Sequence, residues 1–289
     1  MPPARLGLIN GSLGVLIFSA SLPATRVAVL EFDPLFLTLA RASIAAVCAG
    51  LWLAWARARV PALGDLARLA VVALGVVVGF PLLTAIALQQ VTAVRGTVFI
   101  GLLPLATALF GVLRGGERPR PAYWLFSALG AALVAGFAIL SGGSGGEATG
   151  DLLMLAAVLV CGLGYAEGAV LSRRLGGVQV ISWALMLALP VMLPLGVLLR
   201  PDSIANIAAA GWIGLGYVSL FSMFIGFVFW YRGLAQGGIA LVSQVQLLQP
   251  FCGMALAALL LGETLDWPVL LAAAGVAGCV ALARRYGHG

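Results

Sequence analysis

The chain has 289 residues, of which 62% are hydrophobic and 9% are charged, and its net charge is +6. Soluble domains carry about 25% charged residues, so this composition excludes a soluble protein and indicates that lipid surrounds the chain. All sixteen basic residues are arginine, which excludes a P-loop ATP site and a Schiff-base cofactor, because both need lysine.

The residues that usually bind metals are scarce. The single histidine is His288, and the four cysteines (Cys48, Cys161, Cys252 and Cys279) stand apart from one another without a CxxC pair. We therefore expect no metal and no cofactor. The arginines lie in short loops without basic-aromatic clusters, so the positive charge indicates membrane orientation and no nucleic-acid binding.

Apolar runs long enough to cross a bilayer follow one another along the whole chain. About 20 apolar residues span the hydrocarbon core as a helix, and the punctuation by charged residues, proline and glycine predicts an all-α integral membrane protein with ten transmembrane helices. The expected spans are residues 7–30, 34–56, 66–89, 93–113, 121–141, 151–172, 178–199, 209–231, 238–261 and 267–283. The first run also fits a signal peptide, with Arg5 before an apolar stretch and small residues after it.

The arginines divide unequally between alternate loops. Twelve fall on one side, and three on the other: Arg26, Arg95 and Arg200. Because basic residues stay on the cytoplasmic side, both termini are expected in the cytoplasm of a multi-pass protein of the inner (plasma) membrane. The linker SGGSGGEATGD at 141–151 is then outside.

The chain also matches itself. Residues 102–117 (LLPLATALFGVLRGGE) align with residues 248–263 (LQPFCGMALAALLLGE), so that Pro104 pairs with Pro250 and Glu117 with Glu263 at an offset of 146 residues. Since each half would hold five spans, an odd number, the second half enters the membrane from the opposite side. We predict two inverted five-helix repeats, residues 1–141 and 142–289, which together form one transport domain with a site between them.

On these motifs the chain resembles the EamA family of the drug/metabolite transporter superfamily, and within it the YddG-type bacterial amino-acid exporters. The resemblance implies a secondary transporter that exports small metabolites, foremost amino acids, aromatic ones among them, by alternating access. It also implies a central cavity lined by helices 1, 3, 4, 6, 8 and 9. The expected partner is a small-molecule substrate; a monomer is one possible state of the chain, and the oligomeric state stays open.

Polar and aromatic residues inside the runs are the candidates for lining this cavity. The wider set includes Ser21, Thr84, Ser219, Ser222 and the glutamines of the ninth run. From it and its neighbours we assign the substrate cavity to Phe18, Ser19, Phe80, Thr97, Tyr165, Glu167, Ser243, Gln246 and Gln249. Any one hydroxyl can instead bond its own helix or a neighbouring one.

Two charged residues, Glu167 and Arg41, lie well inside runs, away from their ends. A carboxylate in a membrane is a candidate functional group, so Glu167 either binds substrate or a proton, or forms a structural ion pair near the cytoplasmic edge. Arg41 lies seven residues after Pro34. We expect it to extend toward outer acids such as Glu31 or Asp33, or toward loop carbonyls, as a structural residue.

The matched motif residues have structural explanations. Pro104 and Pro250 lie inside the fourth and ninth runs, where each removes a helical hydrogen bond and produces a kink that can shape the cavity or serve as a hinge. Glu117 and Glu263 end these runs, and their carboxylates can accept from backbone N–H groups at the start of the following helix.

Two other classes remain. A membrane enzyme fits poorly, because no acid pair, histidine cluster or nucleophile–base pair lies within the spans. A channel would need rings of polar residues, which the sequence does not offer. An exporter or exchanger of other metabolites or drugs stays open as an alternative to an amino-acid exporter. Glycine pairs four residues apart, such as Gly75-Gly79 and Gly164-Gly168, predict close contacts between helices.

Overall fold

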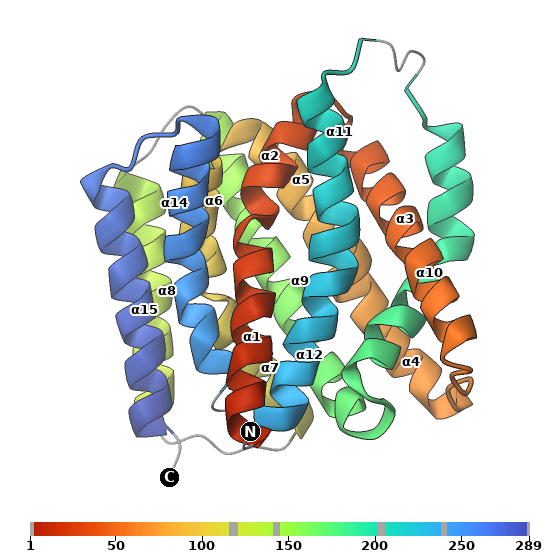
Figure 1. Cartoon of the computed structure of the whole chain (residues 1–289). Coiled ribbons are helices and arrows are strands. Elements are labelled where there is room, and N and C mark those ends of the chain that lie inside the picture. Colours follow the sequence, from red (N-terminus) through yellow and green to blue (C-terminus); the bar gives the residue numbers. More distant parts are fainter. Residues whose placement is uncertain (1–2, 116–120, 141–144, 202–205, 238–241, 288–289) are drawn as a thin grey trace.

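A computed structural model describes residues 3–115, 121–140, 145–201, 206–237 and 242–287. Every regular element in these ranges is a helix, as Figure 1 shows. Seven helical segments are long and apolar enough to cross a membrane: Arg5–Val29, Pro34–Trp55, Leu63–Gln90, Ala93–Leu113, Gly146–Leu175, Gly177–Leu198 and Ala209–Gly233. Three shorter apolar helices cover Trp124–Leu140, Val245–Leu261 and Trp267–Ala283. The expected all-helical membrane class is confirmed.

The helices follow one another with short connections. Residues 3–140 form α1 (Pro3–Ser19), α2 (Ser21–Val29), α3 (Pro34–Trp55), α4 (Leu63–Val72), the π-helix η1 (Ala73–Gly79), α5 (Phe80–Gln90), α6 (Ala93–Ile100), α7 (Leu103–Gly115) and α8 (Pro121–Leu140). Residues 145–287 form α9 (Gly145–Leu175), α10 (Gly177–Leu198), α11 (Ala209–Gly216), the π-helix η2 (Tyr217–Ile225), α12 (Gly226–Gly237), the 3₁₀-helix η3 (Ser243–Leu248), α14 (Gln249–Leu261) and α15 (Trp267–Gly287).

Local sequence sets several helix ends. Asp33 caps α3, because its carboxylate accepts from the N–H groups of Leu35 at 2.8 Å and Phe36 at 3.1 Å, with Pro34 at the first helical position. Thr92 caps α6 by accepting from Arg95 N–H. Gly262 ends α14 with a φ of 66°, a left-handed conformation that glycine adopts without steric cost.

Five apolar segments depart from continuous α-helical geometry. α1 gives way to α2 at Ala20, α6 to α7 at Gly101 and Leu102, and η1, η2 and η3 depart from α-helical geometry. Pro104 and Pro250 stand second in α7 and α14, directly after two of these breaks. The sequence placed a kink at each proline inside a helix, whereas each proline lies at the start of a helical stretch, beside a break in its span. Proline is favoured at a helix start, where its missing N–H would have no helical partner.

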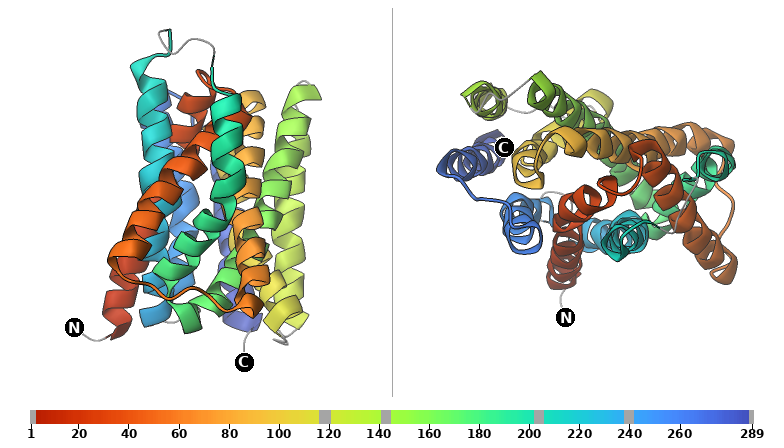
Figure 2. Two further views of the ribbon diagram at one scale, coloured as in Figure 1. Left: turned by 90° about the vertical axis from the view of Figure 1, so that its right-hand side faces the viewer. Right: turned by 90° about the horizontal axis from the view of Figure 1, so that it is seen from above.

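The helices pack as a bundle of long antiparallel and parallel neighbours. α1 packs along α12, α3 along α10, α5 along α9, and α8 along α15. Figure 1 and the view from above in Figure 2 place α8 and α15 together at one edge of the bundle. The remaining helices surround the middle of the molecule, where the interrupted segments meet.

Glycines bring two pairs of helices into backbone contact, η1 with α9 and α1 with α12. A Cβ atom on Gly75 would lie 2.6 Å from the Val160 carbonyl oxygen and 2.9 Å from Gly164 Cα, and one on Gly233 would lie 2.6 Å from Gly11 N. Such distances leave no room for a side chain, and the atoms that would have to move are backbone atoms. The prediction that glycine pairs mark close helix contacts is confirmed for these two pairs.

We expect Gly75→Ala to destabilise the protein by about 1–3 kcal/mol, because overpacking forces η1 away from α9. Gly136→Ala in α8 is the matched control. Nothing lies within 4 Å of a Cβ at Gly136, and alanine is favoured over glycine in a helix by about 0.5–1 kcal/mol. Thermal unfolding of the purified protein measures both. Equal melting temperatures for the two variants would contradict the contact.

Candidate functional site

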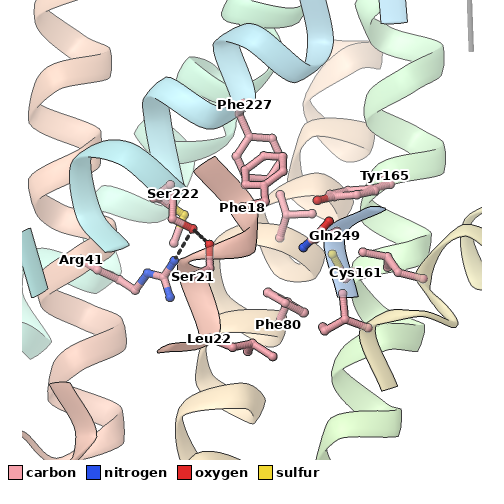
Figure 3. A pocket seen from close by; sticks show the side chains of 14 residues that line it. Phe18, Ser21, Leu22, Arg41, Phe80, Cys161, Tyr165, Ser222, Phe227 and Gln249 are labelled. Atoms are coloured by element: carbon pink, nitrogen blue, oxygen red, sulfur yellow. Dashed lines mark hydrogen bonds between the residues drawn. The ribbon is translucent and has the colours of Figure 1, made fainter. Parts of the chain in front are cut away.

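Side chains from the interrupted segments surround a small cavity of about 30 Å³. Figure 3 shows it from close by. The lining comes from α1, α2, α3, η1, α5, α6, α7, α9, η2, α12 and α14, and consists of Phe18, Ser21, Leu22, Arg41, Val76, Phe80, Ile100, Leu103, Cys161, Tyr165, Ser222, Met223, Phe227 and Gln249. These residues lie near the middle of their segments, so the cavity lies about halfway along the bundle.

The cavity coincides with the helix breaks. Phe18 and Ser21 flank the junction of α1 and α2, Phe80 begins α5 after η1, and Gln249 begins α14 after η3. Ser222 lies within η2. Departures from α-helical geometry often mark functional sites, and in transporters interrupted helices at the midplane commonly form the binding site.

Aromatic rings make one wall. Phe18 meets Phe227 edge to face with ring centroids 5.0 Å apart, and Tyr165 meets Phe227 with centroids 5.9 Å apart. Each pair adds to burial through favourable ring geometry. In Figure 3 Phe80 and Leu22 lie on the other side of the cavity from Phe18 and Phe227.

A polar corner lies between α3, η2 and α2. Arg41 is 4% exposed, and its Nη2 donates to Ser222 Oγ at 3.4 Å. Ser222 Oγ in turn lies 2.7 Å from Ser21 Oγ. Arg41 Nε is buried without a hydrogen-bond partner, and so is the amide oxygen of Gln249. The cavity thus combines apolar walls with unsatisfied polar atoms.

The contacts of Arg41 differ from those that the sequence predicted. No carboxylate of the described residues lies within 4.0 Å of its guanidinium. Asp33 caps its own helix, and the Glu31 carboxylate accepts from Ala208 N–H at 3.1 Å. Arg41 lies two helical turns inside α3, on the face that points into the bundle, so it contacts the cavity and not the outer acids.

Only part of the predicted cavity set lies at the cavity. Phe18, Phe80, Tyr165 and Gln249 line it. Four other candidates are buried elsewhere: Ser19, Thr97, Glu167 and Gln246. Ser19 donates to Val15 O and Thr97 to Ala93 O, each on its own helix, which is the alternative that sequence reasoning had kept open. The side chain of Ser243 lies outside the described part of the chain.

Helical spacing did not identify every lining residue. Arg41 was assigned to structure, and Cys161 was not among the cavity candidates, yet both face the cavity with Phe227. A usable signal existed for Cys161, because it stands four residues before Tyr165 and therefore on the same face of α9. The resemblance implied lining by helices 1, 3, 4, 6, 8 and 9, and the second span joins them through Arg41.

Glu167 takes part in ion pairs between α4 and α9. Its carboxylate lies 3.9 Å from Arg68 Nε, and Asp65 on α4 pairs with Arg174 at the end of α9. Glu167 is 3% exposed and does not line the cavity. This geometry matches the structural alternative stated for Glu167.

The opposite end of α9 has a second ionic contact. Arg95 on α6 binds Asp151 through two hydrogen bonds, Nε to Oδ1 at 2.8 Å and Nη2 to Oδ2 at 2.6 Å. Glu147 lies 3.9 Å from Arg95 Nη1, and the guanidinium stacks 5.3 Å from the ring centroid of Phe137. α9 is therefore held at both ends to helices of residues 3–140.

Glu263 joins the two halves of the chain. Its carboxylate accepts from the N–H groups of Ala93 at 3.0 Å and Val94 at 2.7 Å, the first two residues of α6. The sequence predicted that Glu263 would cap the helix that follows it in the chain, which is α15 and begins at Trp267. That prediction is wrong about the helix, because Glu263 caps α6. The first N–H groups of α6 have no helical acceptor, and a carboxylate is favoured at that positive end. Glu117 lies outside the described residues.

Removing this cap should weaken the fold. We expect Glu263→Ala to lower the free energy of unfolding by about 1–2 kcal/mol, the range of lost helix caps. Glu263→Gln keeps one carbonyl acceptor and should lose less. Thermal unfolding of the purified parent and variants measures the loss of stability in each variant. A Glu263→Ala protein as stable as the parent would show that the two hydrogen bonds contribute nothing.

The chain is similar to known proteins over nearly its whole length. The profile of the EamA-like transporter family matches the chain twice, over residues 5–140 and 148–284. The uncharacterized transporter YdeK of Bacillus subtilis (strain 168) is 64% identical over 280 residues, which cover 97% of each chain. A probable terminal-alkyne amino-acid exporter of Streptantibioticus cattleyicolor is 26% identical, over 94% of this chain and 92% of its own.

Solved structures share the fold. A crystal structure of a protein that is 20% identical superposes with a TM-score of 0.65 and covers 96% of both chains. At this identity the likeness extends to the fold alone.

Proposed function

We propose that this protein, which belongs to the EamA-like transporter family, exports amino acids through the central cavity by alternating access. Family membership and the apolar helices make it a multi-pass membrane transporter. The observation that carries the proposal is the cavity at the interrupted middles of the segments, with apolar walls and a few polar groups. Such a composition suits small molecules that have both kinds of surface.

Ten membrane crossings and inverted repeats are part of the proposal. The seven long and three short apolar helices together make ten candidates. The two matches to the family profile each cover about half of the chain. The π-helices η1 and η2 begin 144 residues apart, at Ala73 and Tyr217, and the breaks before α7 and α14 are similarly matched. Matched distortions are what a duplicated transporter would retain.

We also propose the inner (plasma) membrane, with both termini in the cytoplasm. An even number of crossings brings the termini to one side. Figure 1 marks N and C at the same end of the bundle, which supports this arrangement. The excess of arginine in the loops of that side supports the cytoplasm as its location.

Alternating access is favoured over a channel by the size of the cavity. A water molecule needs about 10–15 Å³ of such space, so about 30 Å³ holds two or three water molecules and no amino acid. A substrate can enter only if the helices around the cavity move apart. The breaks beside Pro104 and Pro250 are the positions where we expect this movement.

Amino acids are supported as substrates by the relative from Streptantibioticus cattleyicolor, which is named as a probable amino-acid exporter. Apolar walls discriminate weakly between side chains, so we expect several amino acids to be carried, aromatic ones among them. The rings of Phe18, Phe227 and Tyr165, among which Phe227 meets the other two edge to face, offer favourable contacts to such side chains.

Dipeptide feeding tests this function. Cells fed with dipeptides accumulate amino acids inside, and cells that express the protein should release them faster than cells with an empty vector. The internal and external amino acids are measured over time by chromatography. The proposal is contradicted if cells in which the protein is verified in the membrane release every amino acid at the same rate as cells with the empty vector.

A further inference from the structure

The geometry points to a carboxylate-binding subsite in the cavity, formed by Arg41 with the hydroxyl groups of Ser222 and Ser21. This inference rests on the proposed transport function and adds the chemical class of the substrate, a small molecule with a carboxylate group. The juxtaposition that carries it is a buried guanidinium, whose Nε has no hydrogen-bond partner, at the wall of a mostly apolar cavity.

Arg41 is a fixed positive charge in the middle of the bundle. A guanidinium is not deprotonated in proteins, and an unpaired charge in a membrane protein is costly. Among the described residues, its only hydrogen-bond acceptor is Ser222 Oγ, at the long distance of 3.4 Å. The carboxylates nearest in sequence, Glu31 and Asp33, bind backbone N–H groups. An anion from outside the protein is the partner that Arg41 lacks.

The rest of the lining adds no negative charge. Apart from Arg41 it consists of apolar residues, a cysteine, a tyrosine, two serines and a glutamine. The cavity therefore has a charge of about +1, and a carboxylate would neutralise it. Arginine binds carboxylates through charge-assisted hydrogen bonds, which are stronger than neutral ones. The hydroxyls of Ser222 and Ser21 lie 2.7 Å apart, so one donates to the other and the pair leaves one further donor beside the guanidinium.

A second unsatisfied polar atom lies across the cavity. The amide oxygen of Gln249 is buried without a partner, and Figure 3 shows Gln249 and Tyr165 on the other side of the cavity from Arg41. An ammonium or other donor group of the same substrate can bind there. A cationic amine without a carboxylate would instead bring a second positive charge close to Arg41, and no negative charge would offset the repulsion.

The test compares matched solutes that differ in one group. The probes are L-phenylalanine, phenethylamine and 3-phenylpropanoate, and likewise L-leucine, 3-methylbutylamine and 4-methylpentanoate. Each is added to purified protein in nanodiscs, and the shift of the melting temperature gives an apparent affinity. We expect the solutes with a carboxylate to stabilise the parent protein, and the amines to bind at least about tenfold more weakly, the lower end for a hydrogen bond to a charged group.

Arg41→Met removes the charge at similar volume. We expect it to abolish stabilisation by the carboxylates, while the melting temperature without ligand stays equal or rises, because an unpaired buried charge is lost. Arg41→Lys keeps the charge and should retain weaker binding. Arg59→Met is the matched control. Arg59 is exposed in the loop before α4. Its replacement should change neither the melting temperature without ligand nor the stabilisation by carboxylates.

The outcomes separate the two claims. If the amines bind as well as the acids, or if Arg41→Met still binds carboxylates with unchanged affinity, the subsite is refuted while transport stands. A lower melting temperature for ligand-free Arg41→Met, with binding intact, would make Arg41 a structural residue. Binding of 3-phenylpropanoate without either amino acid would keep the subsite and refute amino-acid export. No response to any probe would refute both.

Discussion

Asp151→Ala should destabilise the protein by about 3 kcal/mol or more, because breaking a buried ion pair leaves an uncompensated charge. The side chains of Arg95 and Asp151 are 11% and 7% exposed, and two short hydrogen bonds join them. Glu147 lies 3.9 Å from the same guanidinium and is exposed to a greater degree, so it can compensate only in part. Thermal or denaturant unfolding in detergent measures the loss.

The double variant Arg95→Met with Asp151→Leu provides the control. With both charges gone, no buried charge remains unpaired, so the double variant should be more stable than Asp151→Ala. If the double variant is the less stable of the two, the loss comes from packing and not from the unpaired charge. If Asp151→Ala has the parent's stability, the contact between α6 and α9 does not contribute to the fold.

Ser21→Phe should reduce amino-acid transport at least about tenfold, with larger substrates affected before smaller ones. Ser21 lines the cavity at the junction of α1 and α2, and a phenyl ring there would fill a space of about 30 Å³. Overpacking of a closed site costs about 1–3 kcal/mol, so the ring disfavours the closed state that alternating access must pass through and takes up space that a substrate needs. Uptake of radiolabelled alanine, leucine and phenylalanine into proteoliposomes measures the effect.

Leu16→Phe is the matched control for this variant. Leu16 lies on α1 five residues earlier and is 55% exposed on the outside of the bundle, where lipid would surround it. The same phenyl ring should leave transport unchanged there. Equal transport by Ser21→Phe and the parent would mean that the substrate passes elsewhere.

The sequence predicted the helical class well because it depends on composition and on runs of apolar residues. The positions of most helices follow from residues that favour a helix start or end, such as Asp33-Pro34 and Gly262. The local conformations of these residues depend little on the rest of the chain. The helix breaks were harder to predict. The residues of η1 are apolar like their neighbours, and η2 adds only two serines and a tyrosine, which α-helical stretches of this chain also contain, so no change of pattern marks the π-helical geometry.

The cavity could be predicted only in part for a similar reason. Phe18, Phe80, Tyr165 and Gln249 are large or polar and lie at midspan, so the sequence already favoured them. Thr97 and Ser19 looked equivalent, but hydroxyls on helices readily bond the carbonyl four residues earlier, as both do. Which way Arg41 points depends on the rotation of α3 against η2, a tertiary property that periodicity in an almost wholly apolar run does not define.

The central claim is that a carrier moves amino acids through this cavity by alternating access. Counterflow tests it most directly, with purified protein in liposomes that are loaded with unlabelled L-phenylalanine or L-leucine and diluted into the labelled amino acid. The account predicts saturable uptake that is faster in loaded than in empty liposomes, and that Ser21→Phe reduces while Leu16→Phe does not. Uptake that is unsaturable and independent of the internal amino acid, or no uptake at all by folded protein, would contradict it.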